Sequence, residues 1–192
     1  FFKILFLVAI IALIIKAFAI DAFQIPSSSM ENTLQPGDFI IANKFAYNIA
    51  TPREIPIADI HIPQYKLFEL GRPEINDVII FEFPGGFEND SLRGGSKYVK
   101  RIIAGPHDTL HITNGLIFVN GKTLELPSHF KISKETEGGT RIIDDNIYPP
   151  GSKWNRDRYG PIIIPAKGDT IKIAPENFER WQSVIVMDHG ER

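Results

Sequence analysis

Three consecutive serines, Ser27, Ser28 and Ser29, directly follow an apolar segment near the start of the 192-residue chain. A serine hydroxyl becomes a nucleophile when a neighbouring base removes its proton. The five histidines are scattered and form no convincing Ser-His-Asp order, although spacing alone leaves a triad open. A serine nucleophile beside an apolar segment would meet substrates that are already held at a membrane.

Lysine is the alternative base, and Lys100 is the candidate. It lies in a predicted strand of otherwise largely apolar residues, just before a Gly-Pro turn. Burial in apolar surroundings disfavours the charged form of a lysine and thereby makes it a better base. Arg101 follows it, and the alternation of a strand predicts that Arg101 faces the opposite side and points to water.

Other chemistry-bearing residues have simpler interpretations. His107 and His111 have the spacing of metal ligands on a helix, but Pro106 and the strand pattern after it argue against a helix. We therefore expect no metal and no cofactor. Cysteine is absent, which excludes a cysteine nucleophile and thiolate metal sites. Residues 94–97 lack the full phosphate-loop pattern and are predicted to be a flexible loop.

The elements that would position these residues begin with residues 1–22, which we predict to be a transmembrane anchor. Residues 4–15 contain no polar side chain, and Lys3 and Lys16 flank them. Counting 1–20 reaches the roughly 20 residues that a bilayer requires. A cleaved signal peptide, with a cleavage-like site at residues 17–19, and a buried core helix remain alternatives. Because the first residue is Phe, we expect the N-terminus to be truncated.

Residues 23–192 are predicted to form one mainly β domain with an antiparallel sheet. Asn114-Gly115 and Asn120-Gly121 each separate two alternating runs, a pattern that predicts two successive tight hairpins. We expect a short helix at 175–181, irregular segments at 51–76 and 85–96, and a peripheral insertion at 127–165 whose last residues form a strand. The predicted strands are 39–42, 77–83, 98–104, 109–113, 116–119, 122–126, 162–165, 169–173 and 183–187.

Two segments resemble a known family. Residues 23–34, together with 37–40, resemble the nucleophile box of bacterial type I signal peptidases, and residues 98–108 resemble their lysine box. The resemblance implies that Ser29 is the nucleophile and Lys100 the general base. It also implies that the Ser27 hydroxyl helps the Ser29 backbone N–H to bind the oxyanion.

The resemblance further implies the substrate and the location. It makes the protein a membrane-bound endopeptidase on the outer side of the cytoplasmic membrane, with signal peptides of pre-proteins and the lipid bilayer as its partners. Cleavage would follow small residues in an Ala-X-Ala pattern. A formal net charge of −2 gives no indication of nucleic acid as a partner. Shallow substrate pockets would be lined by Ile25, Met30, Leu34, Tyr98 and Val99.

The chain departs from the family pattern in several places. Ser28 and His107 stand where glycine is usual, and Asn32 stands where proline is common. The family's later Gly-Asp-Asn-Arg box is absent, and residues 155–158 are too dissimilar to replace it. We therefore expect the chain to be truncated before that box.

Two other functions remain open from the sequence. A self-cleaving, repressor-like protease shares Ser/Lys chemistry and a β fold, but a soluble switch protein would not need the apolar segment before the serines. A degenerate, membrane-tethered β domain that binds without cutting is favoured by the missing late box.

Overall fold

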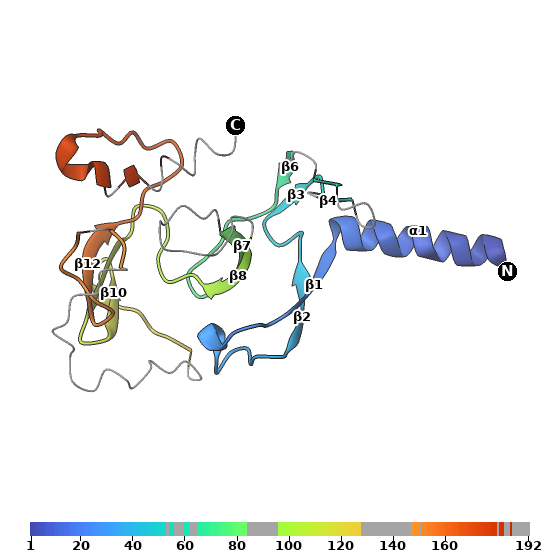
Figure 1. Ribbon diagram of the computed structural model, residues 1–192, viewed down its shortest axis with the longest axis horizontal. Helices are drawn as coiled ribbons and strands as arrows, with labels where there is room; N and C mark the ends of the chain where they lie inside the picture. Colours follow the sequence, from blue (N-terminus) through green and yellow to red (C-terminus); the bar gives the residue numbers. More distant parts are fainter. Residues whose placement is uncertain are drawn as a thin grey trace. The chain divides into compact units, whose positions relative to one another are not determined.

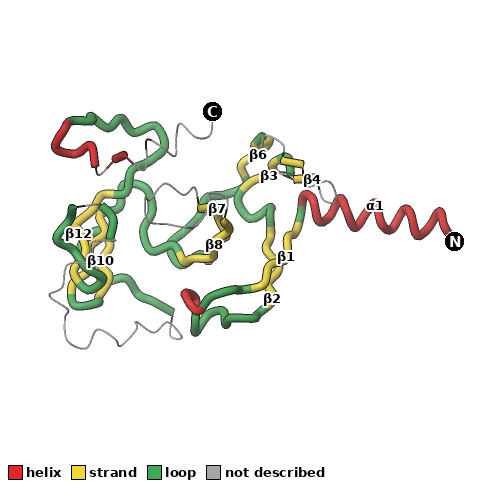
Figure 2. The backbone as a smooth tube through the Cα atoms, in the orientation of Figure 1, coloured by secondary structure: helices red, strands yellow, loops and turns green. Residues whose placement is uncertain are grey.

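The computed structural model describes residues 1–52, 54–55, 60–61, 65–83, 96–127, 147–149, 151–179, 181–182 and 185. The chain divides into two units, Phe1–Glu74 and Ile75–Arg192. All strand pairings among the described residues are antiparallel. Short strands joined by longer loops make up most of the chain beyond the first helix (Figure 2). The prediction of a mainly β, antiparallel fold after an N-terminal helix is confirmed.

The first unit begins with α1, Phe2–Phe18, which has 17 residues and no buried side chain. The Lys44 ammonium donates to the carbonyl oxygens of Lys16 and Ala17, at 3.0 and 3.3 Å, and lies 3.5 Å from an Asp21 carboxylate oxygen. A cation at the C-terminal end of a helix satisfies its free carbonyls and complements its dipole. Within the described part of the chain, we find no helix with both the length and the apolarity required to cross a membrane.

A hairpin of β1, Ile20–Gln24, and β2, Phe39–Asn43, follows α1. The chain then forms two further ribbons. Strand β3, Asn48–Ala50, pairs with β6, Lys66–Glu69, and β4, Glu54–Ile55, pairs with β5, Ile60–His61. The prediction that residues 51–76 are irregular is therefore wrong where β4, β5 and β6 occur.

The second unit contains a ribbon of β7, Val78–Phe83, and β8, Ser96–Arg101, and a four-stranded sheet in the order β11-β10-β9-β12. The sheet strands are β9, Thr109–Thr113, β10, Leu116–Val119, β11, Lys122–Thr123, and β12, Arg158–Ile163. Both Asn-Gly turns have positive φ at both residues, between 51° and 78°. The two predicted hairpins are thus confirmed.

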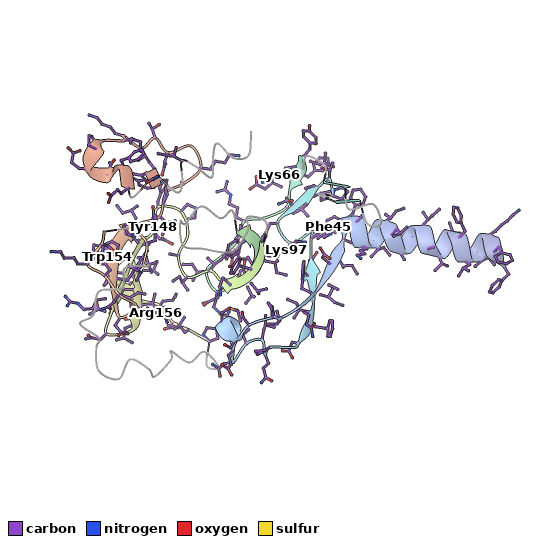
Figure 3. The ribbon with its side chains drawn as sticks, in the orientation of Figure 1. Phe45, Lys66, Lys97, Tyr148, Trp154 and Arg156 are labelled. Carbon is purple, nitrogen blue, oxygen red and sulfur yellow. The ribbon has the colours of Figure 1, made fainter. Side chains whose placement is uncertain are left out.

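The core of the second unit lies on the four-stranded sheet. Leu110, Val119 and Ile162 are buried, and Tyr148 and Trp154 are among the half-buried side chains packed against them (Figure 3). Ile162 comes from β12, which pairs with β9. The end of the 127–165 stretch therefore belongs to the central sheet, while its residues 128–146 lie outside the described part.

Several other predicted boundaries differ. Strand β8 ends at Arg101 rather than continuing to residue 104, and residues 169–173 form no strand. The predicted helix at 175–181 begins as the 3-10 helix η3, Pro175–Asn177, followed by helical residues at 178–179 and 181. Residues 84–95 lie outside the described part, as do residues 183–184 and 186–187 of the last predicted strand.

Candidate active site

The three serines lie at the closed end of the β1–β2 hairpin. The Ile25 amide donates to Asp38 O at 2.9 Å, and the Gly37 amide donates to Ile25 O at 2.8 Å, so the ladder continues one step beyond the strands. The 3-10 helix η1, Ser28–Met30, occupies the connecting loop. Figure 1 shows this short blue helix at the end of the hairpin opposite α1.

Burial separates the serines from the apolar residues around them. Ile25 and Met30 are 4% and 9% exposed, whereas all three serines are exposed. Burial of the apolar side chains stabilises the turn, while the hydroxyls stay accessible to a substrate. The Ser27 and Ser29 hydroxyl oxygens are 3.4 Å apart, which is long for a hydrogen bond between hydroxyls.

Lys100 lies on β8, opposite Ile79 of β7. Tyr98 and Phe81 are paired one step along the same face, and their rings are stacked with centroids 6.1 Å apart. The Lys100 Nζ atom is 5.9 Å from the Tyr98 ring centroid. Lys100 is half-buried, and its ammonium lies beside the aromatic ring of Tyr98.

Arg101 occupies the other face of β8, but it does not simply point to water. Its side chain is half-buried, and its Nη1 atom donates to the Asn76 carbonyl oxygen at 2.7 Å. The Asn76 amide in turn donates to Ile102 O at 2.8 Å. Arg101 therefore fastens the end of β8 to the residues that precede β7, and the prediction of a solvated side chain is wrong.

The remaining predicted contact residues divide between the two units. Leu34 is half-buried and follows η1, where its amide donates to Met30 O at 2.8 Å. Tyr98 and Val99 are half-buried on β8. The structure brings Ser27, Ser29, Ile25, Met30 and Leu34 together in Phe1–Glu74, and Tyr98, Val99 and Lys100 together in Ile75–Arg192.

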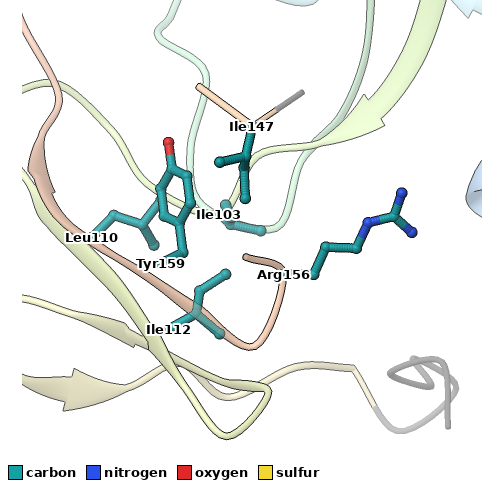
Figure 4. A pocket seen from close by; sticks show the side chains of 6 residues that line it. All are labelled: Ile103, Leu110, Ile112, Ile147, Arg156 and Tyr159. Carbon is teal, nitrogen blue, oxygen red and sulfur yellow. The ribbon is translucent and has the colours of Figure 1, made fainter. Parts of the chain in front are cut away.

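An apolar cavity of about 340 Å³ lies in the second unit. Its walls are Ile103, Leu110, Ile112, Ile147, Tyr159 and Arg156, and the Arg156 guanidinium points away from the apolar side chains (Figure 4). None of the predicted site residues lines it. The cavity is therefore not where the predicted chemistry would occur.

A family model covers both the serine turn and the strand that carries Lys100. The family model described as signal peptidase, peptidase S26, matches residues 1–182. The chain belongs to the signal peptidase family.

Curated relatives carry the same family name. The chain is 37% identical to signal peptidase I of Pseudomonas aeruginosa over 123 residues, which are 64% of this chain and 36% of the relative. It is 35% identical to signal peptidase I of Pseudomonas fluorescens over 125 residues, or 65% of this chain and 37% of the relative. With the enzyme of Rickettsia prowazekii, identity is 29% over 166 residues, or 81% of this chain and 56% of the relative. The chain thus spans between 36% and 56% of the length of these signal peptidases.

Positive φ angles occur at two of the positions where the chain departs from the signal peptidase pattern. His107, which stands where glycine is usual, has φ of 66°. Glycine adopts this left-handed conformation without steric cost, whereas a side chain does not. Asn32 has φ of 76°. The proline that is common at this position could not adopt that angle, because its ring holds φ at about −65°.

Sequence analysis missed a group of side chains around the turn at His107. The His107 Nε2 atom lies 3.1 Å from both carboxylate oxygens of Asp169. Asp108 accepts hydrogen bonds from the Gly105 amide and the Asn120 side chain, each at 2.7 Å, and the Gly105 bond is the main cause that lowers the pKa of Asp108. His107 and Asp169 are far apart in the sequence, so no local pattern indicates their contact.

Residues 155–158, which only faintly resemble the family's late box, have a structural role. The Asn155 side-chain oxygen accepts hydrogen bonds from the Asp157 and Arg158 amides, at 2.9 and 2.8 Å. An asparagine that binds the backbone two and three residues on forms a turn of its own. Here that turn begins β12. This structural role explains residues 155–158, and no relation to the late box is needed.

Proposed function

We propose that this chain carries the Ser/Lys dyad of a membrane-anchored signal peptidase, with Ser29 as nucleophile and Lys100 as general base. The supporting observation is that the chain contains both an exposed serine turn and a half-buried lysine beside an aromatic ring, each within residues 1–182 that match the family. The two groups belong to different units, so their meeting is part of the proposal.

The reaction would proceed through an acyl-enzyme. Neutral Lys100 would take the proton of the Ser29 hydroxyl as the oxygen attacks the scissile carbonyl carbon. The Lys100 ammonium would then protonate the departing amine, and the released mature protein would leave an ester on Ser29. Water, deprotonated by the same lysine, would hydrolyse this ester.

The developing oxyanion would be bound by the Ser29 backbone N–H and the Ser27 hydroxyl. The contact between Ser27 and Ser29 at 3.4 Å supports this assignment, because it places both hydroxyls on the same exposed side of the turn. Donors that are already in position stabilise the charge that forms in the transition state.

The substrate would be a pre-protein with small residues before the cleavage site. Leu34, Tyr98 and Val99 are half-buried and present partial surface for contact with a small side chain. Ile25 and Met30 are buried, so in this proposal they shape the pocket from beneath.

The anchor would be α1. Its side chains are almost all exposed and apolar, and its 17 residues extend about 26 Å at about 1.5 Å per residue, against a hydrocarbon core of about 30 Å. Lys44 and Asp21 at its C-terminal end would lie at the headgroup level. We propose that the β units lie on the outer side of the cytoplasmic membrane.

Cleavage of a pre-protein that ends its signal peptide in Ala-X-Ala tests the proposal. The protein in detergent micelles should release the mature product, and Ser29→Ala and Lys100→Ala should each abolish release. Ser28→Ala, a neighbouring hydroxyl with no assigned role, is the matched control and should retain activity. Full cleavage by Ser29→Ala or Lys100→Ala would refute the dyad.

A further inference from the structure

The turn that follows β8 is joined to the end of β12 through His107. The His107 amide donates to Ile164 O at 2.7 Å, and the Ile164 amide donates to Asp108 O at 2.9 Å. The His107 backbone adopts its left-handed conformation, with φ of 66°, at this point. The backbone at His107 and Asp108 is therefore hydrogen-bonded to Ile164, the residue that follows β12.

The imidazole makes a second link, to the loop at 166–169. An ionised carboxylate only accepts hydrogen bonds, so the imidazole makes this link in the form that carries a proton on Nε2. Asp169 is itself fixed, because its Oδ2 atom accepts the Ala166 amide at 2.8 Å. This bond, followed by that from His107, lowers the pKa of Asp169, which keeps the carboxylate ionised above acidic pH.

The turn is also connected to the strand that carries Lys100. The Ile102 amide donates to Asp77 O at 2.9 Å, which continues the β7–β8 ladder past its last strand residue. The Gly105 amide then donates to the Asp108 carboxylate at 2.7 Å. The backbone between Ile102 and Gly105 joins these two hydrogen bonds, so the end of β8 is linked along the chain to the turn at His107, and the imidazole links that turn to Asp169.

We infer that His107 and Asp169 are positioning residues for Lys100. Their contact holds the turn after β8 against the loop after β12. The family resemblance predicts a glycine at position 107, and a glycine could not make this contact. The inference rests on the proposed function of Lys100 as general base. His107 and Asp169 side chains are 68% and 37% exposed, so their effect is modest. Because both side chains are exposed, we expect loss of the contact to change the rate only about two- to fivefold.

Three variants distinguish the effect of the contact between His107 and Asp169 from the effect of the left-handed backbone at His107. Asp169→Asn weakens the contact and keeps an acceptor for the Ala166 amide. His107→Gly removes the contact and relieves the left-handed backbone, whereas His107→Ala removes the contact and retains the backbone cost. We expect all three to lower kcat for pre-protein cleavage about two- to fivefold with KM unchanged. His107→Gly combined with Asp169→Asn should be no slower than either single variant.

Glu69→Gln is the matched control, since it weakens an exposed ion pair, Lys66–Glu69 at 3.3 Å, in the other unit. It should leave kcat unchanged. Wild-type kcat in Asp169→Asn and His107→Gly, or losses that multiply in the double variant, would overturn the inference.

Hydrogen exchange measured by mass spectrometry gives a readout that does not depend on cleavage. Peptides that contain the Gly105, His107 and Ile164 amides should exchange faster in Asp169→Asn than in the wild type. If the wild type cleaves no pre-protein while this acceleration occurs, the proposed function fails and the link between turn and loop stands. If the wild type is active and amide exchange is unchanged in Asp169→Asn, this inference is overturned but the proposed function is not.

Discussion

The Lys100 ammonium lies 5.9 Å from the centre of the Tyr98 ring, two residues earlier on the same face of β8. An aromatic face attracts a cation at this distance. The relationship places the proposed base beside a ring that is itself stacked on Phe81 of β7. Tyr98 therefore contacts both the proposed base, Lys100, and the aromatic side chain of the neighbouring strand, Phe81.

Replacement of the ring should destabilise the second unit. Tyr98→Leu loses the stack on Phe81 and the contact with Lys100, which together correspond to about 1–2 kcal/mol. Urea denaturation, monitored by the fluorescence of the tryptophans, measures the loss. Tyr98→Phe retains the ring and serves as control. Equal free energies of unfolding for Tyr98→Leu and the wild type would contradict this role.

Gly160 should tolerate no side chain. Its φ is 82°, and a Cβ atom at this position would lie 2.6 Å from the Leu110 carbonyl oxygen, so β12 could not keep its pairing with β9. We expect Gly160→Ala to cost more than about 2 kcal/mol in the free energy of unfolding, since strain and a backbone clash add.

Gly168 is the matched control for that substitution. It has φ of 95°, but a Cβ atom there would have no neighbouring atom of the described residues within 4 Å, so Gly168→Ala should carry only the conformational cost, about 1 kcal/mol. A larger loss for Gly168→Ala than for Gly160→Ala in the same urea experiment would refute the close approach at Leu110.

Asp108 should make stability depend on pH in the acid range. Hydrogen bonds from the Gly105 amide and the Asn120 side chain hold its pKa below its usual value. The carboxylate therefore stabilises the fold above the unfolded pKa of about 3.9, and this contribution is lost as pH falls through the lower folded pKa. The free energy of unfolding should differ between wild type and Asp108→Asn at pH 6, and the difference should shrink towards pH 2. If the difference in the free energy of unfolding grows as the pH falls, the prediction for Asp108 is contradicted.

Ser27 should affect the rate of cleavage more than substrate binding. Loss of one oxyanion donor typically lowers kcat about 10²–10³-fold, so Ser27→Ala should lose activity on this scale while Ser29 still forms some acyl-enzyme. Ser28→Gly, which introduces the residue usual in the family, should behave as wild type. Undiminished kcat in Ser27→Ala would remove Ser27 from the oxyanion site.

The sequence was most informative where structure depends on neighbouring residues. The Asn114-Gly115 and Asn120-Gly121 hairpins were predictable because positive φ at both turn residues selects those amino acids. The apolar face around Lys100 was predictable for a similar reason, since the alternation of a strand sets which side chains share a face.

Features that depend on distant partners could not be predicted in this way. Residues 169–173 alternate like a strand but have no pairing partner among the described residues, and Asp169 instead binds the Ala166 amide and His107. The contact between His107 and Asp169 joins two loops, and neither loop has a pattern that indicates the other. The pairing of β12 with β9, interrupted by a bulge at Tyr159–Ile162, is likewise set by the core rather than by local sequence.

Covalent trapping of Ser29 is the most direct test of the Ser/Lys dyad. The protein is treated in detergent micelles with an acylating serine-protease inhibitor, and the modified residue is located by peptide mass spectrometry. We expect one adduct, on Ser29, that is absent in Ser29→Ala and much slower to form in Lys100→Ala, while Ser28→Ala is labelled like the wild type. Labelling of another residue in place of Ser29, or equal labelling rates in Lys100→Ala and the wild type, would contradict the dyad.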